Sequence, residues 1–384
     1  MTRTGFNKYE VIILSNRLRL CCPCHFGLES VLKYEITKIG GTDLKVSDGK
    51  ISFTGDENIM ARANICLSTA ERVLIELMEF RAETFEDLFQ GVRSIEFERF
   101  IGTDNAFPVK GYSLNSTLHS VPDCQSIVKK ATVERLKSKY GINWFSETAA
   151  PVQIQFSILK DIVTIYLDTS GVGLHKRGYR RNSNAAPIKE TLAAGIVDLA
   201  RVRPESIVCD PFCGSGTLLI EAALKALRIP VGINRRFAAE KWESINSEIW
   251  QEERKRAIEN VDRSASFHGI GFDIDDAAVA LTLDNAHKAG VKSRIKIEQA
   301  DITKFHQPDD SIVICNPPYG ERLLELREAE NIYRQMGRVL GHGGNRQSYI
   351  ISPHEQFEQF FGTEAKRRRK LYNGMIKCQL YMYF

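Results

Sequence analysis

Residues 206–224 read SIVCDPFCGSGTLLIEAAL, an apolar strand that ends in a glycine-rich turn and continues as a helix. Further strand-like runs lie at residues 266–275, 295–301, 311–320 and 347–352, with helical patterns between them. Strand followed by helix, repeated along the chain, predicts an α/β fold with a mainly parallel sheet and helices on both faces. Ligands of such sheets bind at the carboxyl ends of the strands, so we expect the chemistry of this chain at that edge.

The turn after the first strand, from Asp210 to Thr217, is typical of a nucleotide cradle. Gly214 and Gly216 permit backbone angles closed to other residues and let a ligand approach the main chain. The turn lacks the spacing GxGxxG, and neither GKS nor GKT follows, so the pattern disfavours a triphosphate-binding loop. A tight turn required only for packing remains the alternative.

Carboxylates follow the next two strands. Asp273, in the sequence GFDID, is placed to accept hydrogen bonds from both hydroxyls of a ribose, with Asp275 as its neighbour or a helix cap. Asp301, after the strand IKIEQ, is placed either to accept the amino group of an adenine or to cap the following turn.

The 63 residues from Asp210 to Asp273 far exceed the roughly 20 of a dinucleotide-binding unit. The excess predicts an insertion, residues 231–268, which we interpret as a helical elaboration beside the site. We expect its Trp242 and Trp250 in the core rather than stacked on a substrate.

The run Cys315-Asn-Pro-Pro-Tyr-Gly320 after the strand SIVI is the most specific signal in the chain. Two prolines fix the backbone just past the strand, which holds the Asn316 side chain and the adjacent carbonyl in one orientation. Both groups accept hydrogen bonds, as an exocyclic amine of a planar base requires, and Tyr319 offers a ring that can stack on that base. We expect no metal and no catalytic cysteine, although Cys213 and Cys315 lie nearby. The lone CxxC of Cys21 and Cys24 is interpreted as two half-buried thiols.

Composition bounds the remaining possibilities. The chain has 384 residues and a net charge of +4, with 43% hydrophobic and 26% charged residues, which is ordinary for a globular protein of two or three domains. No apolar run reaches the ~18 residues of a membrane span, the N-terminus lacks a signal-peptide pattern, and nine scattered cysteines fit a reducing compartment. These features predict a cytoplasmic protein.

The order DPFCGSGTLLIEAA, GFDID, QAD and NPPYG resembles the amino-methyltransferases that use S-adenosylmethionine. NPPYG followed by Glu321-Arg-Leu323 is similar to the THUMP-containing RNA guanine N2-methyltransferases, and among them to the bacterial 23S ribosomal RNA type with a single methyltransferase unit. The resemblance extends over nearly the full chain through three further stretches: CPCHFGLESVLKYEI, HKRGYRRNSNAAPIKETLAAGIV and KLYNGMIKCQLYMY. It implies an N-terminal ferredoxin-like domain (1–65), a THUMP RNA-binding domain (66–167) and a Rossmann-like class I methyltransferase domain (168–384).

The resemblance also implies roles for individual residues. S-adenosyl-L-methionine, which leaves as S-adenosyl-L-homocysteine, would be bound by Asp210, Cys213, Gly214, Ser215, Gly216, Thr217, Asp273, Ile274, Asp301 and Asn316. The target amine would be received by Asn316, Pro317, Pro318 and Tyr319. The implied reaction is direct methylation of the N2 amine of a guanosine in RNA, after that base has left its stack.

Two basic stretches are candidates for gripping RNA phosphates. The first comprises Lys176, Arg177, Tyr179, Arg180 and Arg181, with no acid between Asp168 and Glu190. The second, residues 366–370, is five consecutive cations and is equally consistent with a solvated face. Ribosomal RNA is the expected substrate and a monomer the expected state; a tRNA guanine N2-methyltransferase, an adenine N6-methyltransferase acting on DNA or RNA, and a catalytically silent RNA-binding factor are the alternatives.

Overall fold

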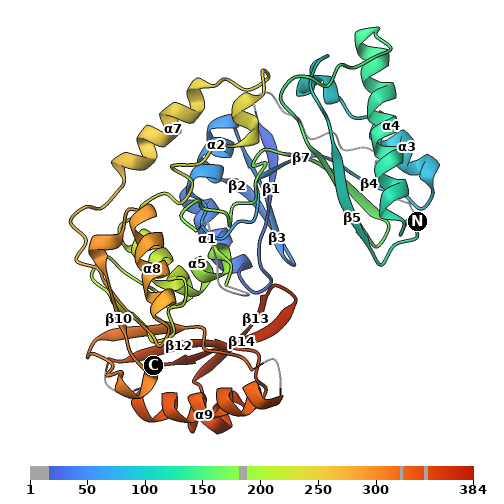
Figure 1. Cartoon of the computed structure of the whole chain (residues 1–384). Helices are drawn as coiled ribbons and strands as arrows, with labels where there is room; N and C mark the ends of the chain where they lie inside the picture. Colours follow the sequence, from blue (N-terminus) through green and yellow to red (C-terminus); the bar gives the residue numbers. More distant parts are fainter. Residues whose placement is uncertain (1–16, 181–187, 321–322, 341–344) are drawn as a thin grey trace, which may run out of the picture.

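The computed structural model describes residues 17–180, 188–320, 323–340 and 345–384, and within them the strands form two seven-stranded sheets (Figure 1). The first sheet has the order β2-β3-β1-β4-β7-β6-β5, antiparallel except for the β5–β6 pair. Its strands are β1 (Leu18–Pro23), β2 (Thr42–Ser47), β3 (Lys50–Gly55), β4 (Leu74–Arg81), β5 (Val109–Leu114), β6 (Ile154–Leu159) and β7 (Ile162–Asp168). Its helices are α1 (Glu29–Lys38), α2 (Glu57–Cys66), α3 (Phe85–Arg93) and α4 (Val121–Tyr140), with a 3₁₀ turn at Phe97–Arg99.

The second sheet has the order β10-β9-β8-β11-β12-β14-β13 and is parallel from β10 to β12, as the strand–helix alternation predicts. Only β14 and β13 run antiparallel to their neighbours. Its strands are β8 (Ile207–Asp210), β9 (His268–Asp273), β10 (Ile295–Gln299), β11 (Ser311–Cys315), β12 (Gln347–Ser352), β13 (Arg367–Asn373) and β14 (Ile376–Tyr383). The chain order moves outward from β8 to β10 and then returns to β11 on the other side of β8. This reversal opens a crevice at the carboxyl ends of β8 and β11.

The helices of this half of the chain are α5 (Glu190–Leu199), α6 (Thr217–Ala226), α7 (Glu248–Glu259), α8 (Asp276–Lys288), α9 (Leu323–Val339) and α10 (Phe357–Phe361), and all of them except α7 pack with the second sheet. Short 3₁₀ turns lie at Ala238–Lys241, Lys292–Arg294 and Ile302–Lys304. Separate apolar clusters fill the two faces of this sheet, and a third lies under the first sheet. None of the helices in the described ranges combines the length and the apolar character that a membrane crossing needs.

The insertion at residues 231–268 lies against the N-terminal half of the chain. Its helix α7 runs beside α2 (Figure 1), and Trp242 and Trp250 are buried in the apolar cluster of the first sheet, as expected for core residues. The Trp242 indole donates to the Pro151 carbonyl at 3.1 Å, and Arg62 on α2 pairs with Glu253 on α7 at 2.7 Å. The expectation that the insertion lies beside the site is therefore wrong, because its tryptophans pack into the cluster of the first sheet and none of residues 231–268 lines the cavity described below.

Candidate active site

A cavity of about 600 Å³ opens at the carboxyl ends of the parallel strands. Residues after four neighbouring strands line it, because the ends of β8 to β11 meet at one edge of the sheet. The lining comprises Lys189, Pro211, Phe212, Asp273, Ile274, Ala300, Asp301, Ile302, Asn316, Pro317, Pro318, Tyr319, Gly320, Glu325, Ile332, Asn373, Gly374 and Ile376. This volume is in the range of small-molecule and cofactor sites.

The glycine turn, Cys213 to Thr217, directly follows the lining residues Pro211 and Phe212, but neither Asp210 nor any residue of the turn itself lines the cavity. Gly214 and Gly216 have φ angles of +53° and +77°, a region that favours glycine. A Cβ atom on Gly216 would lie 2.6 Å from the Thr282 methyl group, whereas one on Gly214 would meet no atom within 4 Å, so only the second glycine is required for packing. The space beside the Gly214 Cα is therefore open, whereas its amide and carbonyl are bonded to Asp273 and Thr282.

Helix α8 supports this turn through two polar residues that sequence reasoning missed. Thr282 donates to the Gly214 carbonyl at 2.8 Å, and Asn285 donates to the Ser215 carbonyl at 2.9 Å. Both side chains are fully buried. Their signal in the sequence was polar residues three positions apart on the otherwise apolar face of that helix.

Asp210 lies beneath the turn and is almost fully buried, accepting a hydrogen bond from the Phe212 amide at 3.1 Å. Burial raises the pKa of its carboxyl to about 8, since a charge there is poorly solvated. Burial also raises the pKa of the Cys213 and Cys315 thiols well above their ordinary value, so neither is poised as a thiolate nucleophile.

The two carboxylates after β9 and β10 line the cavity together. Asp273 accepts from the Gly214 amide at 2.9 Å and from the Asp275 amide at 3.0 Å, which ties the second strand to the turn of the first. Asp301 accepts from the amide and hydroxyl of Thr303, both through Oδ1, and these bonds lower the pKa of its carboxyl. Asp301 thus caps the next turn while it also faces the cavity, and Ile274 lies exposed beside Asp273.

Asn316 to Tyr319 form the opposite wall. Tyr333 on α9 donates to the Pro318 carbonyl at 2.9 Å and fixes this loop from below. The Tyr319 hydroxyl donates to Asn316 Oδ1, and the Asn373 amide donates to the Tyr319 oxygen at 3.5 Å. The oxygen expected to receive the target amine is therefore engaged by Tyr319 here. Sequence reasoning missed Tyr333 and Asn373, whose positions give no local signal.

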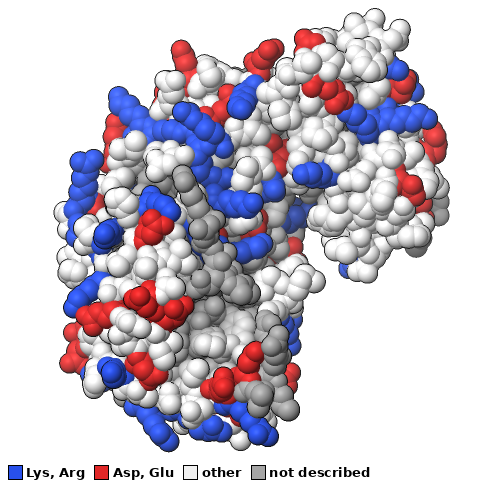
Figure 2. Space-filling view, in the orientation of Figure 1, with Lys and Arg blue, Asp and Glu red and all other residues white. Residues whose placement is uncertain are grey.

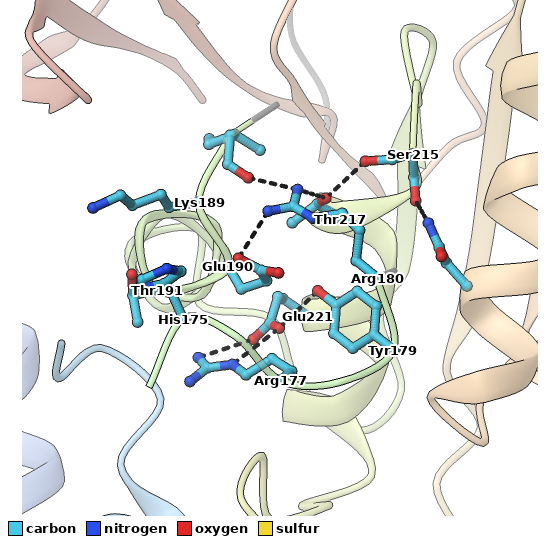
Figure 3. Close-up of polar contacts among 12 residues, drawn as sticks. His175, Arg177, Tyr179, Arg180, Lys189, Glu190, Thr191, Ser215, Thr217 and Glu221 are labelled. Carbon is cyan, nitrogen blue, oxygen red and sulfur yellow. Dashed lines mark hydrogen bonds and ion pairs between the residues drawn. The ribbon is translucent and has the colours of Figure 1, made fainter. Parts of the chain in front are cut away.

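The basic stretch after residue 175 differs from the expectation of an exposed RNA surface (Figure 3). Arg177 and Tyr179 are buried, and both contact Glu221 on α6, at 3.4 Å and 3.0 Å. Arg180 bonds Thr217 at 3.1 Å and Glu190 at 2.9 Å.

These three side chains brace the glycine turn and α6, because a buried carboxylate there requires a cationic partner. The prediction of exposed phosphate contacts is therefore wrong for the buried Arg177 and Tyr179, whereas Arg180 is partly exposed and its contact with RNA stays a prediction. Lys176 is exposed and remains a candidate, and Arg181 lies outside the described residues.

The second basic stretch, Lys366 to Lys370, begins one residue before the edge strand β13, continues into it and is largely exposed. Arg368 pairs with Glu358 at 2.6 Å, and Arg369 donates to the Gly27 carbonyl at 3.0 Å. On the face shown in Figure 2, Lys and Arg gather over the α7 part of the molecule and its middle, whereas Asp and Glu gather over the α8–β10 part. Across the described ranges, no group of three or more His, Cys, Asp or Glu side chains is arranged to hold a metal ion.

Three family comparisons match consecutive parts of the chain. Residues 19–74 match the RlmL ferredoxin-like domain, residues 82–168 the THUMP domain, and residues 177–382 the RMKL-like methyltransferase domain.

Named relatives agree with these matches. YpsC of Bacillus subtilis (strain 168), named as a supposed RNA methyltransferase, is 41% identical over 95% of each chain. The ribosomal RNA large subunit methyltransferase K/L of Methylococcus capsulatus is 32% identical over 93% of this chain and 50% of its own length.

Two solved structures are similar over the full fold. SMU.472, described as a supposed methyltransferase in complex with S-adenosylhomocysteine, has a TM-score of 0.91 and 35% identity, covering 97% of this chain and 99% of its own. A Listeria monocytogenes protein, described as a predicted N6-adenine-specific DNA methylase, has a TM-score of 0.91 and 40% identity, covering 96% of each chain.

Proposed function

The chain belongs to the RMKL-like methyltransferase family and carries the RlmL ferredoxin-like and THUMP domains before its catalytic domain, and from this premise we propose that it methylates the N2 amine of a guanosine in RNA. We propose large-subunit ribosomal RNA as the substrate, which the name of the Methylococcus relative supports. We also propose a monomer, with domains at residues 1–65, 66–167 and 168–384.

The cofactor of this family is S-adenosylmethionine, which supplies an electrophilic methyl group when bound. The residues present fit it. The open space beside Gly214 suits the methionine end of the cofactor. The Asp273 carboxylate suits its ribose, and Asp301 at the end of the next strand suits its adenine. Ser215, Thr217, Cys213 and the buried Asp210 would support the same end of the site.

The single observation that carries the proposal is that Asn316 and Pro317 both line the cavity, with the Asn316 amide oxygen held by the Tyr319 hydroxyl. An aromatic amine is a poor nucleophile because its lone pair is delocalised into the ring. Two acceptors that bind its N–H groups raise the electron density on nitrogen and hold it in place. The Asn316 oxygen has two lone pairs and can accept from the amine as well as from Tyr319, whose ring is then at hand to stack on the base.

Adenine N6 methylation is the second candidate, supported by the description of the Listeria structure and by the same acceptor pair. The THUMP match favours RNA over DNA as the substrate. The preference for guanine over adenine as the target base rests on the family resemblance of the whole chain. A tRNA guanosine is a third possibility within the same chemistry.

The proposal is tested by incubating the purified enzyme with labelled S-adenosylmethionine and a nucleic acid from a strain lacking the gene. The nucleic acids are deproteinised ribosomal RNA, tRNA and duplex DNA. We expect label in 23S ribosomal RNA and N2-methylguanosine in the nucleosides identified by mass spectrometry. N6-methyladenosine, or label in DNA alone, would refute it.

A variant pair tests the role of the amide. Asn316→Ala should lower the rate on the order of 10² or more. Asn260→Ala should have no effect, because that side chain only bonds its own helix, at Arg256.

A further inference from the structure

The turn that joins β13 and β14 lies at the mouth of the cavity although it belongs to none of the expected motifs. Asn373 and Ile376 close the hairpin as a pair, so Gly374 and Met375 form a two-residue loop. Gly374 has a φ angle of +63°, as the first loop position of such a hairpin favours. Asn373, Gly374 and Ile376 all line the cavity, and Asn373 contacts the Tyr319 hydroxyl.

Met375 is 97% exposed, more than any other large apolar side chain of the described residues. Loop positions of tight hairpins usually carry polar residues or glycine, because an apolar side chain there gains nothing from folding. Its neighbour Ile376 is 37% exposed and faces the cavity. The apolar tip therefore projects beside the place where a substrate base must enter.

The base of the same hairpin adds aromatic rings and cations. Phe26, from the N-terminal unit, is 55% exposed and meets the Tyr372 ring edge-on at 6.1 Å between centroids. The Lys370 ammonium lies 5.3 Å from the centre of the Tyr372 ring, and Lys377 is exposed opposite Tyr372. Exposed rings with interleaved cations are typical of surfaces that stack bases and hold phosphates.

We propose that this hairpin is the element that extracts the target nucleotide from its RNA stack, with Met375 inserted in the space that the base leaves and with Phe26 and Tyr372 against the flanking base. A base buried in folded RNA cannot reach a cavity at the strand ends without leaving its stack. Apolar side chains serve as wedges between bases in other nucleic-acid complexes. The inference rests on the proposed function, since it requires an RNA target.

The test uses the full-length enzyme and an RNA hairpin that contains the mapped target nucleotide. 2-Aminopurine, which keeps the 2-amino group, replaces the target guanine and reports unstacking by a rise in fluorescence. We expect the wild-type enzyme with S-adenosylhomocysteine to produce this rise. Met375→Ala should bind the RNA with a Kd within about threefold of wild type yet produce little of the rise, because the unstacking energy of a few kcal/mol is no longer compensated.

Methylation rates provide the second readout. Met375→Ala should lower kcat/KM about 10-fold or more on the paired guanine and less than about threefold on a guanine opposite an abasic site, where the base is unpaired and leaves its stack at lower cost. The matched control is Ile258→Ala, which removes a half-exposed apolar side chain of α7 at the other side of the molecule. It should leave kcat/KM on both RNAs unchanged.

Equal losses on both RNAs, an unchanged fluorescence rise in Met375→Ala, or a change only in its oligomeric state would overturn the wedge. No rise with wild-type enzyme on an RNA that it methylates would also overturn it. Failure of the proposed function looks different, because wild-type enzyme would then transfer no methyl group to any RNA.

Discussion

Replacing Arg177 by alanine separates a structural role from an RNA-binding role. The guanidinium donates to the Leu174 carbonyl at 2.7 Å and the Ser68 carbonyl at 2.5 Å, and it pairs with Glu221 at 3.4 Å. The two charged side chains are only 2% and 1% exposed. Burial raises the pKa of the Glu221 carboxyl, and Arg177 is the main group that opposes this.

The expected loss of stability in Arg177→Ala follows from the buried polar groups that the substitution leaves without a partner. An unpaired carboxylate and two carbonyls without their donor would stay buried, which costs about 3–5 kcal/mol. At about 2–4 °C per kcal/mol, the melting temperature should fall by about 6–20 °C. The double change Arg177→Met with Glu221→Gln keeps an acceptor for Tyr179 and removes both charges, so it should restore most of the loss.

Two assays decide the matter. Differential scanning calorimetry measures the melting temperature, and RNA binding between 50 and 200 mM salt gives the slope of log K against log salt. Each phosphate contact contributes roughly 0.7–0.9 to that slope, so Arg177→Ala should leave it unchanged while the exposed Lys176→Ala lowers it. An unchanged melting temperature, together with a lower slope for Arg177→Ala, would refute the structural role.

Substitutions at three further positions address the site. Asp210→Asn should make the protein more stable than wild type above pH 8. The native pKa of Asp210, about 8, lies above the ordinary 3.8, so wild type loses up to about 1.4 kcal/mol of stability per pH unit as the pH rises from about 4 to 8. Denaturation of both proteins at pH 5 and pH 9 measures the difference. Asp273→Asn should weaken S-adenosylmethionine binding by about 10-fold or more in calorimetry, since ribose hydroxyls lose a charged acceptor; an unchanged Kd would contradict that role. Tyr319→Ala should raise the KM for RNA about 5- to 150-fold while Tyr319→Phe stays within a few-fold, because the ring rather than the hydroxyl stacks on the base; equal effects in steady-state kinetics would argue against stacking.

The order of elements in the catalytic domain was predictable because each strand is a short apolar run that ends in a distinctive polar turn. Asp273, Asp301 and Asn316 meet at one cavity since parallel strands share one carboxyl edge. The buried supports were not predictable in this way. Tyr333 and Asn373 reach the loop from an amphipathic helix and an antiparallel hairpin, and only the three-dimensional packing of those elements brings them there.

The error about the first basic stretch has a clear physical origin. A run of cations was interpreted from its neighbours in sequence, where no acid lies between Asp168 and Glu190. The partner of Arg177 is Glu221, an acid 44 residues away on a helix that reads as wholly apolar around it. A carboxylate within an apolar helical face was the available signal, since such a residue is buried only when paired.

Arg177 also connects the N-terminal half of the chain to the glycine turn of the cofactor site. Its side chain bonds Ser68 in the N-terminal half and Glu221 on α6, and α6 begins at the glycine turn of the cofactor site. The Arg62–Glu253 pair joins the same halves through the insertion. Both contacts start from the ferredoxin-like part of the chain, so they hold that part, rather than the THUMP domain, directly against the methyltransferase domain.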